Sequence, residues 1–319
     1  MSAKPDANNR VSISWINGMA LEDPSELVRR SEAAYDRQIQ NAVAKVYENR
    51  EERPILLVSG PSASSKTTSA NKIAAGLRAR GIESAVVSLD DFFKNRDDLP
   101  ILPNGETDFE SIDTLHMETV QACFDELLST GEAMFPRFDF KRGVRENGVN
   151  PVKAGHGSVL IVEGIHALNP KITEGCVKGG FMRLYISPNS DYEDAGRVIL
   201  TSREVRLIRR LVRDHFYRGS SVENTMTMWS GVVRSEIVNI VPYESAADIV
   251  VDSMILYEPA VWVRYLGTVL STDGISRRHE PKLRKLRRAL DRFIPIDLSL
   301  LPKETVLREF LEPDGVRSL

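Results

Sequence analysis

Short apolar runs that alternate with helical stretches dominate the middle of the chain. Residues 54–59 (PILLVS) form a continuous apolar run that ends in a cluster of Gly, Pro and Ser, which is typical of a strand buried on both faces. Residues 70–80 are rich in helix formers, and Gly81 ends them. This alternation predicts a doubly wound α/β fold, with a mainly parallel sheet and helices on both of its faces. Further strands are expected at residues 84–89, 159–162, 182–186 and 248–251.

Residues 91–156 depart from this alternation. They combine polar turns, a helix near residues 113–130 and a β-like stretch at residues 135–140. We expect them to form an insertion over the carboxyl edge of the sheet. Substrates of open α/β folds bind at that edge, so the insertion is expected to bind the substrate.

The two ends of the chain flank this core. Residues 1–10 are polar and expected to be loose, and Asp23 with Pro24 predicts a capped helix that runs to about residue 48. The expected division is an N-terminal lead-in (1–52), a core domain (53–258) with the insertion (91–156) and a lid (203–235), and a helical C-terminal extension (259–319).

The composition is that of a globular protein. Hydrophobic residues make up 42% and charged residues 27% of the 319 residues, which argues against a disordered or fibrous chain. The net charge of −3 and the pI near 6.1 exclude a globally basic nucleic-acid-binding protein. Two cysteines, Cys123 and Cys176, fit a reducing compartment. Because no run has membrane length and the start lacks an apolar signal core, the expected location is the cytoplasm.

The loop after the first core strand has the composition of a phosphate-binding loop. Its sequence is GPSASSKTT, residues 60–68. Amide groups at the start of a helix face an anion, Lys66 would neutralise phosphate oxygens, and the Thr67 hydroxyl would reach Mg²⁺. Ser65 replaces the second glycine of the pattern G-x-x-x-x-G-K-[ST], which predicts a lower nucleotide affinity. A small-residue turn that merely caps a helix is the alternative. The residues expected to bind the nucleotide are Gly60, Ser62, Ala63, Ser64, Ser65, Lys66, Thr67 and Thr68.

Acidic side chains follow two of the expected strands. Asp90 and Asp91 come directly after residues 84–89, and Glu163 ends the run 159–162. Phosphoryl transfer needs a carboxylate at the attacking hydroxyl and oxygen ligands for a divalent ion. The ends of parallel strands share one edge, so Glu163 and one of the two aspartates are candidates for these tasks. The other aspartate is expected to cap the following turn.

Arginines recur at three- and four-residue spacing between residues 202 and 219, in a stretch expected to be a helix. A helix of this kind that closes over a nucleotide would stabilise charge on the transferred phosphoryl group. The alternative is a solvated face paired with acids, although acids are few in this stretch. The arginines on the shared face are Arg203, Arg206, Arg210 and Arg213.

A second basic stretch lies in the tail. Residues 277–292 carry eight Lys or Arg against two acids. One stripe of this stretch is apolar, which predicts an amphipathic helix docked by its leucines. Contact with nucleic acid or anionic lipid is the alternative. The stripe consists of Leu283, Leu286, Leu290 and Phe293.

Together these residues resemble the uridine kinase and phosphoribulokinase family of P-loop kinases, especially bacterial uridine-kinase-like nucleoside kinases. The resemblance covers about residues 54–259 and rests on the ordered motifs GPSASSKTT, VSLDDFF, TDFESID, PRFDF, LIVEGIHAL and RLIRRLVRDHFYRG. It implies transfer of a phosphoryl group from ATP, with Mg²⁺, to a small molecule, most simply the 5′-hydroxyl of a ribonucleoside. Neither nucleic acid nor a membrane is expected as a partner, and self-association stays open. The tail segments YEPAV and VLREF share the resemblance without a predicted role.

The resemblance also implies residue roles. Asp90 falls on the family's base-and-metal aspartate, which leaves Asp91 as the capping residue, and Glu163 falls on the magnesium-side glutamate. Phe93 stands where nucleoside kinases usually carry a tyrosine beside the sugar, and Glu110 falls on the acid that grips the ribose diol. The matching lid arginines, near the phosphates and the substrate, are Arg210 and Arg213.

Two departures bear on the substrate. Phe138 and Gly143 stand where pyrimidine-specific relatives carry a tyrosine and a histidine around the base, which implies looser or different base selection. A kinase for a sugar phosphate, held by Arg142 and Arg145, is therefore an alternative. A non-catalytic nucleotide-binding regulator, suggested by Ser65 and touching RNA through the basic tail, is another.

Overall fold

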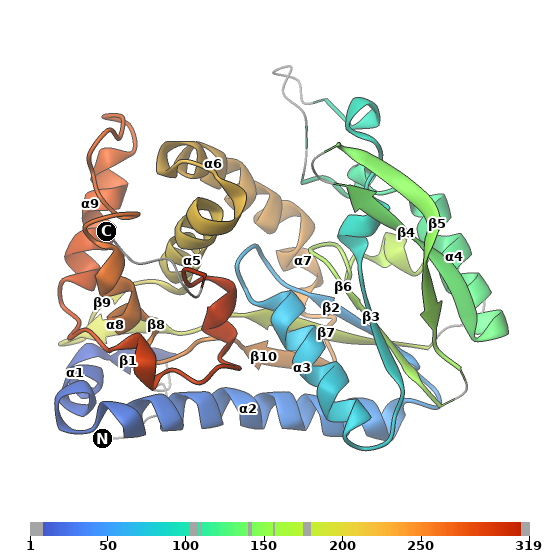
Figure 1. Cartoon of the computed structure of the whole chain (residues 1–319), viewed down its shortest axis with the longest axis horizontal. Helices are drawn as coiled ribbons and strands as arrows, with labels where there is room; N and C mark the ends of the chain where they lie inside the picture. The colour runs from blue at the N-terminus through green and yellow to red at the C-terminus, as the bar shows by residue number, and fades with distance from the viewer. Residues whose placement is uncertain are drawn as a thin grey trace.

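A five-stranded, all-parallel sheet forms the centre of the computed structural model, which describes residues 9–101, 108, 110–139, 142–155, 157–174 and 180–313. The strand order is β10-β7-β2-β6-β3, so the first core strand, β2, is central (Figure 1). The chain crosses from β2 to the edge strand β3, returns to β6, and then continues through β7 to β10 on the other side. This confirms the doubly wound α/β fold. The strands are β2 (Ile55–Ser59), β3 (Ser84–Ser88), β6 (Val159–Glu163), β7 (Phe181–Ser187) and β10 (Ile249–Asp252).

The central strand β2 shows why these runs are apolar without alternation. Leu56 and Val58 belong to one buried cluster, whereas Ile55 and Leu57 belong to a second cluster on the opposite face. Successive side chains point to opposite faces, and both faces are covered. A continuous apolar strand is the consequence.

Helices from distant parts of the chain cover the two faces. α2 (Pro24–Asn49) runs along the sheet beside α3 (Lys66–Arg78) (Figure 1). The Asp23 side chain caps α2 by accepting a hydrogen bond from the Glu26 amide at 2.9 Å, as the Asp-Pro pair predicts. α4 (Met117–Thr130) packs on the other face.

The N-terminal segment corrects an expectation. Arg10 is not loose: it begins β1 (Arg10–Ser12), which pairs in parallel with β8 (Asp191–Asp194). β8 in turn pairs with β9 (Arg197–Leu200), and α1 (Ile13–Glu22) follows β1. β1 (RVS) and β8 (DYED) are short and mostly polar, so no apolar run reveals them. The lead-in is therefore built into a second, smaller sheet.

The insertion follows β3 through the short helical turns η1 (Leu89–Phe92), η2 (Arg96–Asp98) and η3 (Ile112–Thr114). After α4, the antiparallel hairpin of β4 (Glu132–Asp139) and β5 (Val144–Lys153) stands beside β3 (Figure 1). Phe140, expected at the end of the β-like stretch, lies outside the described residues, as does Cys176. The Cys123 thiol is free and buried.

From Ser202 onward the chain is mainly helical. α5 (Ser202–Arg218) begins with a capping box of Thr201 and Glu204. The leucine stripe of α9 (Glu280–Leu290) is buried, so this helix docks by its apolar face as predicted. None of the described helices is long and apolar enough to cross a membrane. The remaining elements are α6 (Val222–Asn239), α7 (Val241–Glu244), α8 (Glu258–Trp262), η4 (Pro170–Ile172), η5 (Val263–Tyr265), η6 (Leu298–Leu300) and η7 (Val306–Glu309).

Candidate functional site

The loop between β2 and α3 borders a cavity of about 620 Å³ at the carboxyl edge of the sheet. Gly60 must be a glycine, because a Cβ there would lie 2.0 Å from the carbonyl oxygen of Ile186. Ala63 and Ser65 adopt the left-handed backbone conformation, with φ of 61° and 66°, which glycine adopts most easily. The Ser65 hydroxyl lies 3.4 Å from Nη1 of the fully buried Arg209. It is therefore directed toward the protein interior.

Lys66 is the first residue of α3 and lines the same cavity. Its Nζ donates a hydrogen bond to the carbonyl oxygen of Pro61 at 3.1 Å, so the side chain folds back over the loop. The surrounding protein desolvates the ammonium group and lowers its pKa, and the nearby carboxylates of Glu163 and Asp90 oppose this shift. A cation held beside the amide groups at a helix start is suited to phosphate oxygens.

Two acids reach this cavity from neighbouring strands. Glu163 ends β6, is only 6% exposed, and accepts a hydrogen bond from the Thr67 hydroxyl at 3.1 Å. Asp90 lies in η1, directly after β3, and β3 pairs with β6. A Cβ at Gly164 would lie 2.7 Å from the Cβ of Leu89, so the glycine lets η1 approach the end of β6 closely. The structure thus brings Asp90 and Glu163 to one cavity.

Enclosure by protein perturbs both carboxyl groups. Asp90 is accessible from the cavity, but protein atoms crowd it on most sides, and this desolvation raises its pKa. Burial also raises the pKa of Glu163, and the charge of Asp90 adds to this shift. The negative charges of Asp90 and Glu163 repel each other, so ionisation of both groups is unfavourable. A bound cation would stabilise the two carboxylates.

Thr67, Glu163 and Asp90 offer the oxygen donors that Mg²⁺ prefers. Within the described part of the chain, no three His, Cys, Asp or Glu side chains lie close enough to hold a metal ion by themselves. Thr67 and Glu163 supply a hydroxyl and a carboxylate in direct contact, and Asp90 adds a second negative charge. Mg²⁺ is usually held by one or two carboxylates together with water and substrate phosphates. This donor set suits an ion that enters together with a nucleotide.

Arginines of α5 contact the phosphate loop. Arg206 donates to the Ser62 carbonyl at 3.2 Å and to Glu236 at 2.6 Å, and Arg210 donates to the Ser62 hydroxyl at 2.9 Å. Arg206 and Arg210 are 3% and 5% exposed, whereas the Arg203 side chain is 48% exposed. The arginines therefore do not form one solvated face. Glu236 comes from α6, so counting acids within the stretch missed it.

Arg209 was not on the predicted face, yet among the described arginines it is the most deeply buried, with an exposed fraction of 0%. Its Nε and Nη2 donate to the two carboxylate oxygens of Glu258 at 2.7 and 2.8 Å, and its Nη1 lies 3.3 Å from the Ala63 carbonyl. Nη2 also donates to the Ser253 carbonyl at 2.8 Å. The guanidinium therefore fastens the underside of the loop to the end of the sheet.

The far side of the cavity consists of residues from the insertion. The rings of Phe93 and Phe138 meet edge to face, with centroids 5.7 Å apart. Glu110 lines the cavity beside them, and burial raises its pKa. Asp91 does not cap the following turn: its carboxylate accepts the Phe138 amide at 3.1 Å and so fixes β4 to η1. The local sequence does not indicate this contact, because the Phe138 amide lies on a distant strand.

Most of the predicted residues line this cavity. Those that do not are Gly60, Thr68, Arg142, Arg145, Arg203 and Arg206. Gly60 lies against the Ile186 carbonyl, and Thr68 donates to Glu309 at 2.8 Å. Arg145 donates to Asn147 at 2.9 Å and to the Phe93 carbonyl at 3.4 Å instead of lining the cavity. The predicted residues that line it are Ser62, Ala63, Ser64, Ser65, Lys66, Thr67, Asp90, Phe93, Glu110, Phe138, Glu163, Arg210 and Arg213.

Several lining residues carry no signal in the sequence. Arg96 stands in a polar connection, and Glu309 belongs to the tail, more than 140 residues beyond Glu163. Arg218 is also on α5, but it follows Arg213 by five residues and so departs from the three- and four-residue spacing of the predicted arginines. The lining residues that sequence reasoning missed are Arg96, Leu99, Gly164, Ile165, Arg218, Met228 and Glu309.

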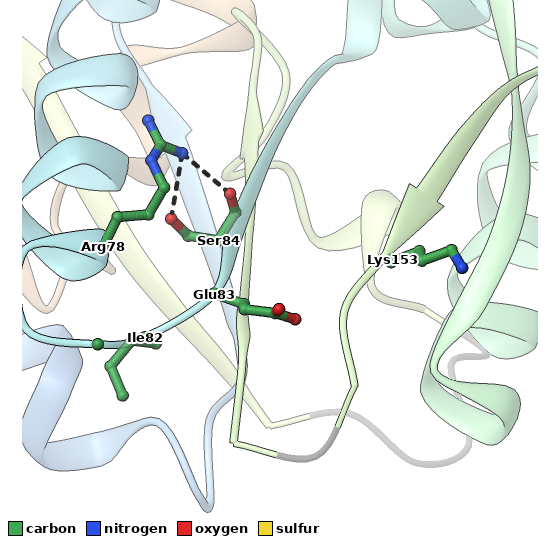
Figure 2. A pocket seen from close by; sticks show the side chains of 6 residues that line it. Arg78, Ile82, Glu83, Ser84 and Lys153 are labelled. Carbon is green, nitrogen blue, oxygen red and sulfur yellow. Dashed lines mark hydrogen bonds between the residues drawn. The ribbon is translucent and has the colours of Figure 1, made fainter.

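A separate cavity of about 510 Å³ lies at the amino end of β3 and does not belong to this site. Figure 2 shows it between the α3–β3 connection and Lys153 at the end of β5. Arg78 there donates to the carbonyl and hydroxyl of Ser84 at 3.1 and 3.5 Å (Figure 2). Because ligands of open α/β folds bind at the carboxyl ends of the strands, this groove at the amino end carries no functional assignment.

The geometry at the carboxyl edge places the chain among P-loop kinases, the class in which a loop of this kind grips phosphates and a neighbouring acid meets the acceptor hydroxyl. Residues 55–257 match the model of the Phosphoribulokinase / Uridine kinase family. The chain belongs to that family. Membership makes it a phosphotransferase that uses ATP and acts on a small molecule.

Individual relatives are distant. A uridine kinase of Clostridium novyi is 27% identical over 203 residues, which are 62% of this chain and 87% of the relative. Uridine kinase-like protein 5 of Arabidopsis thaliana is 26% identical over 198 residues, 62% of this chain but only 38% of the relative. A solved structure described as a "possible uridine kinase" from Bacillus stearothermophilus is 16% identical, has a TM-score of 0.42, and covers 66% of this chain and 98% of its own.

Proposed function

We propose that the protein is an ATP- and Mg²⁺-dependent kinase that phosphorylates the 5′-hydroxyl of a ribonucleoside. The observation that carries the proposal is the position of Asp90. It opens into one cavity that has Lys66 and the phosphate loop on one side and Phe93, Glu110 and Phe138 on the other. An acceptor on the insertion side would therefore present its hydroxyl to Asp90 and to the last phosphate of ATP.

The residues divide the reaction among them. Asp90 accepts the proton of the acceptor hydroxyl while that oxygen bonds to the γ-phosphorus and the bond to the β,γ-bridging oxygen breaks, which releases ADP. Lys66 and the loop amides hold the β- and γ-phosphate oxygens, and Arg210 and Arg213 balance charge on the transferred group. Thr67, Glu163 and Asp90 would hold Mg²⁺, whose charge would offset that of the phosphates.

The insertion side has the chemistry of a nucleoside site. Phe93 and Phe138 offer apolar ring surfaces beside the cavity, against which a sugar and a base can pack. Glu110 offers a carboxylate acceptor for two neighbouring sugar hydroxyls. Phe138 supplies stacking without a hydroxyl, so the site would bind the base by packing more than by hydrogen bonds.

A panel of nucleosides with γ-labelled ATP tests the proposal. We expect label to appear on the 5′-oxygen of at least one ribonucleoside, and not on its 5′-deoxy analogue. Thermal shifts with a non-hydrolysable ATP analogue rank the candidates first, since a ligand at 100 times its Kd stabilises the folded protein by about 2.7 kcal/mol. ATP binding without labelling of any nucleoside would refute the nucleoside assignment.

One observation favours a second candidate, a kinase for a small anionic acceptor such as a sugar phosphate. Arg96 lines the cavity, and a Cβ at Gly143 would lie 2.9 Å from its Nε, so the glycine makes room for the guanidinium. Arg142 and Arg145, the arginines expected to hold a sugar phosphate, do not line the cavity. Arg142 pairs with Glu146 at 2.8 Å, and Arg145 donates to Asn147 at 2.9 Å.

Arg96→Leu separates the two candidates. For an anionic acceptor, loss of the guanidinium should raise KM at least tenfold, because hydrogen bonds to charged groups are worth about 1.5–3 kcal/mol. For a neutral nucleoside, KM should change little. Competition between phosphorylated and unphosphorylated acceptors gives the same answer without a variant.

A further inference from the structure

The C-terminal extension reaches the donor side of the phosphate loop. η7 packs against α3, and Oε2 of Glu309 accepts a hydrogen bond from the Thr68 hydroxyl at 2.8 Å. Glu309 also lines the main cavity and acts electrostatically on Lys66. A residue more than 50 positions beyond the family core thus borders the place where the phosphates of ATP would lie.

The segment that carries Glu309 is anchored firmly. Val306, Leu307 and Phe310 are fully buried, and the Phe310 ring lies 5.2 Å from the Arg209 guanidinium beneath the loop. Thr305, just before η7, donates to the buried Glu32 at 2.6 Å. The segment therefore fixes the position of the Glu309 carboxylate, which is needed for a residue that recognises a ligand.

The chemistry of a carboxylate limits what it can recognise. It accepts hydrogen bonds and repels phosphate, so its favourable partners on a nucleotide are sugar hydroxyls and amino groups of the base. Thr68 lies in the first turn of α3, only two residues beyond Lys66, and a helix rises 1.5 Å per residue. Glu309 is therefore close to the phosphate chain, where the nearest hydrogen-bond donor is the sugar.

We propose that Glu309 is a specificity residue for the donor, accepting a hydrogen bond from a ribose hydroxyl of ATP. The inference rests on the proposed use of ATP by this loop, and it gives the C-terminal extension a role in the donor site. Thr68 is a positioning residue in this arrangement, because its hydroxyl orients the carboxylate. Oε1 of Glu309 makes no hydrogen bond to a described residue and is left for the nucleotide.

Calorimetry with four probes tests this without knowledge of the acceptor: ATP, 2′-deoxy-ATP, 3′-deoxy-ATP and inorganic tripolyphosphate. We expect the parent protein to bind ATP about tenfold more tightly than one of the two deoxy analogues, as loss of a charged hydrogen bond implies. Glu309→Ala should weaken ATP binding about tenfold, to the level of that analogue, and should not weaken binding of tripolyphosphate.

Two further variants keep the test decisive. Glu309→Gln preserves the shape of the segment should the alanine loosen it, and it should weaken ATP binding by a smaller factor. Glu312→Gln is the matched control: Glu312 lies three residues on and pairs with Arg264 at 2.7 Å, away from the loop, so its affinities should equal those of the parent.

Other outcomes overturn the inference. If both Glu309 variants bind all four probes more tightly than the parent does, the carboxylate acts only by repelling the phosphates and does not bind the sugar. Equal affinities in parent and variants would also refute it, while leaving the kinase proposal intact. If the parent binds neither ATP nor tripolyphosphate, the proposed function fails first, and this inference fails with it.

Discussion

The Thr67 hydroxyl donates a hydrogen bond to Oε1 of Glu163 at 3.1 Å, which joins the start of α3 to the end of β6. Both groups are oxygen donors, and Asp90 acts on Glu163 from the neighbouring strand end. The bond therefore marks the point where the phosphate loop, the candidate metal ligands and the candidate base meet. The strand order dictates this meeting, because β6 lies between β2 and β3.

Replacing the candidate base should separate binding from chemistry. Asp90→Asn keeps the shape of the side chain but cannot accept the proton of the acceptor hydroxyl. We expect kcat to fall about 10²- to 10⁴-fold, while the Kd of a non-hydrolysable ATP analogue, measured without Mg²⁺, changes little. Label transfer and analogue binding, measured on the same preparation, check this. Parent-like turnover would rule out the assigned role.

The raised pKa of Asp90 predicts a pH profile. The base acts as a carboxylate, so kcat/KM should fall as the pH is lowered through a pKa that desolvation places above the ordinary value for aspartate. The positive charge of Arg218 favours the carboxylate and lowers this pKa. Arg218→Gln should therefore move the acid limb of kcat/KM to higher pH.

A control with the same loss of charge makes this measurement specific. Arg203 is also on α5, but its guanidinium lies 3.4 Å from Glu236, and it does not line the main cavity. Arg203→Gln should leave the acid limb in place. An acid limb that moves equally in both variants would show that general charge, not Arg218 itself, sets the pKa.

The fold was largely predictable because the strands β2 and β6 at its centre are buried along their whole length. Each of these two strands is a continuous apolar run, a pattern that needs no tertiary information. The phosphate loop was predictable for the same reason, since strand, small residues, Lys66 and helix are adjacent in the chain. Asp90 and Glu163 followed from the rule that parallel strands end at one edge.

What could not be predicted depends on contacts between distant segments. The acids that pair with Arg206 and Arg209 come from α6 and α8. Asp91 meets a backbone amide 47 residues away. Glu309 lines the cavity because the tail folds back over α3, and no local sequence pattern predicts this contact. Arg96 was hidden in the same way, in a connection without a hydrophobic period.

Ser65 offers a test of backbone strain. Its φ of 66° is in the left-handed region, so Ser65→Gly should relieve strain and raise the free energy of unfolding by about 0.5–1 kcal/mol. Ser65→Ala keeps the strained backbone but removes the hydroxyl that faces Arg209, so it should not stabilise the protein. Urea denaturation of the three proteins distinguishes these effects. Stabilisation by alanine as well as glycine would contradict the strain argument.

The buried pair of Arg209 and Glu258 should dominate the stability of the region under the loop. Both side chains are fully buried, so Arg209→Met leaves a carboxylate without its partner, and we expect a loss of about 3–5 kcal/mol in the free energy of unfolding. The double variant Arg209→Met with Glu258→Leu removes both charges and should recover most of that loss. Urea denaturation of the single and double variants measures the recovery. If the double variant is as unstable as the single one, the cost comes from the lost contacts of Arg209 to the Ala63 and Ser253 carbonyls, and the pair itself contributes little.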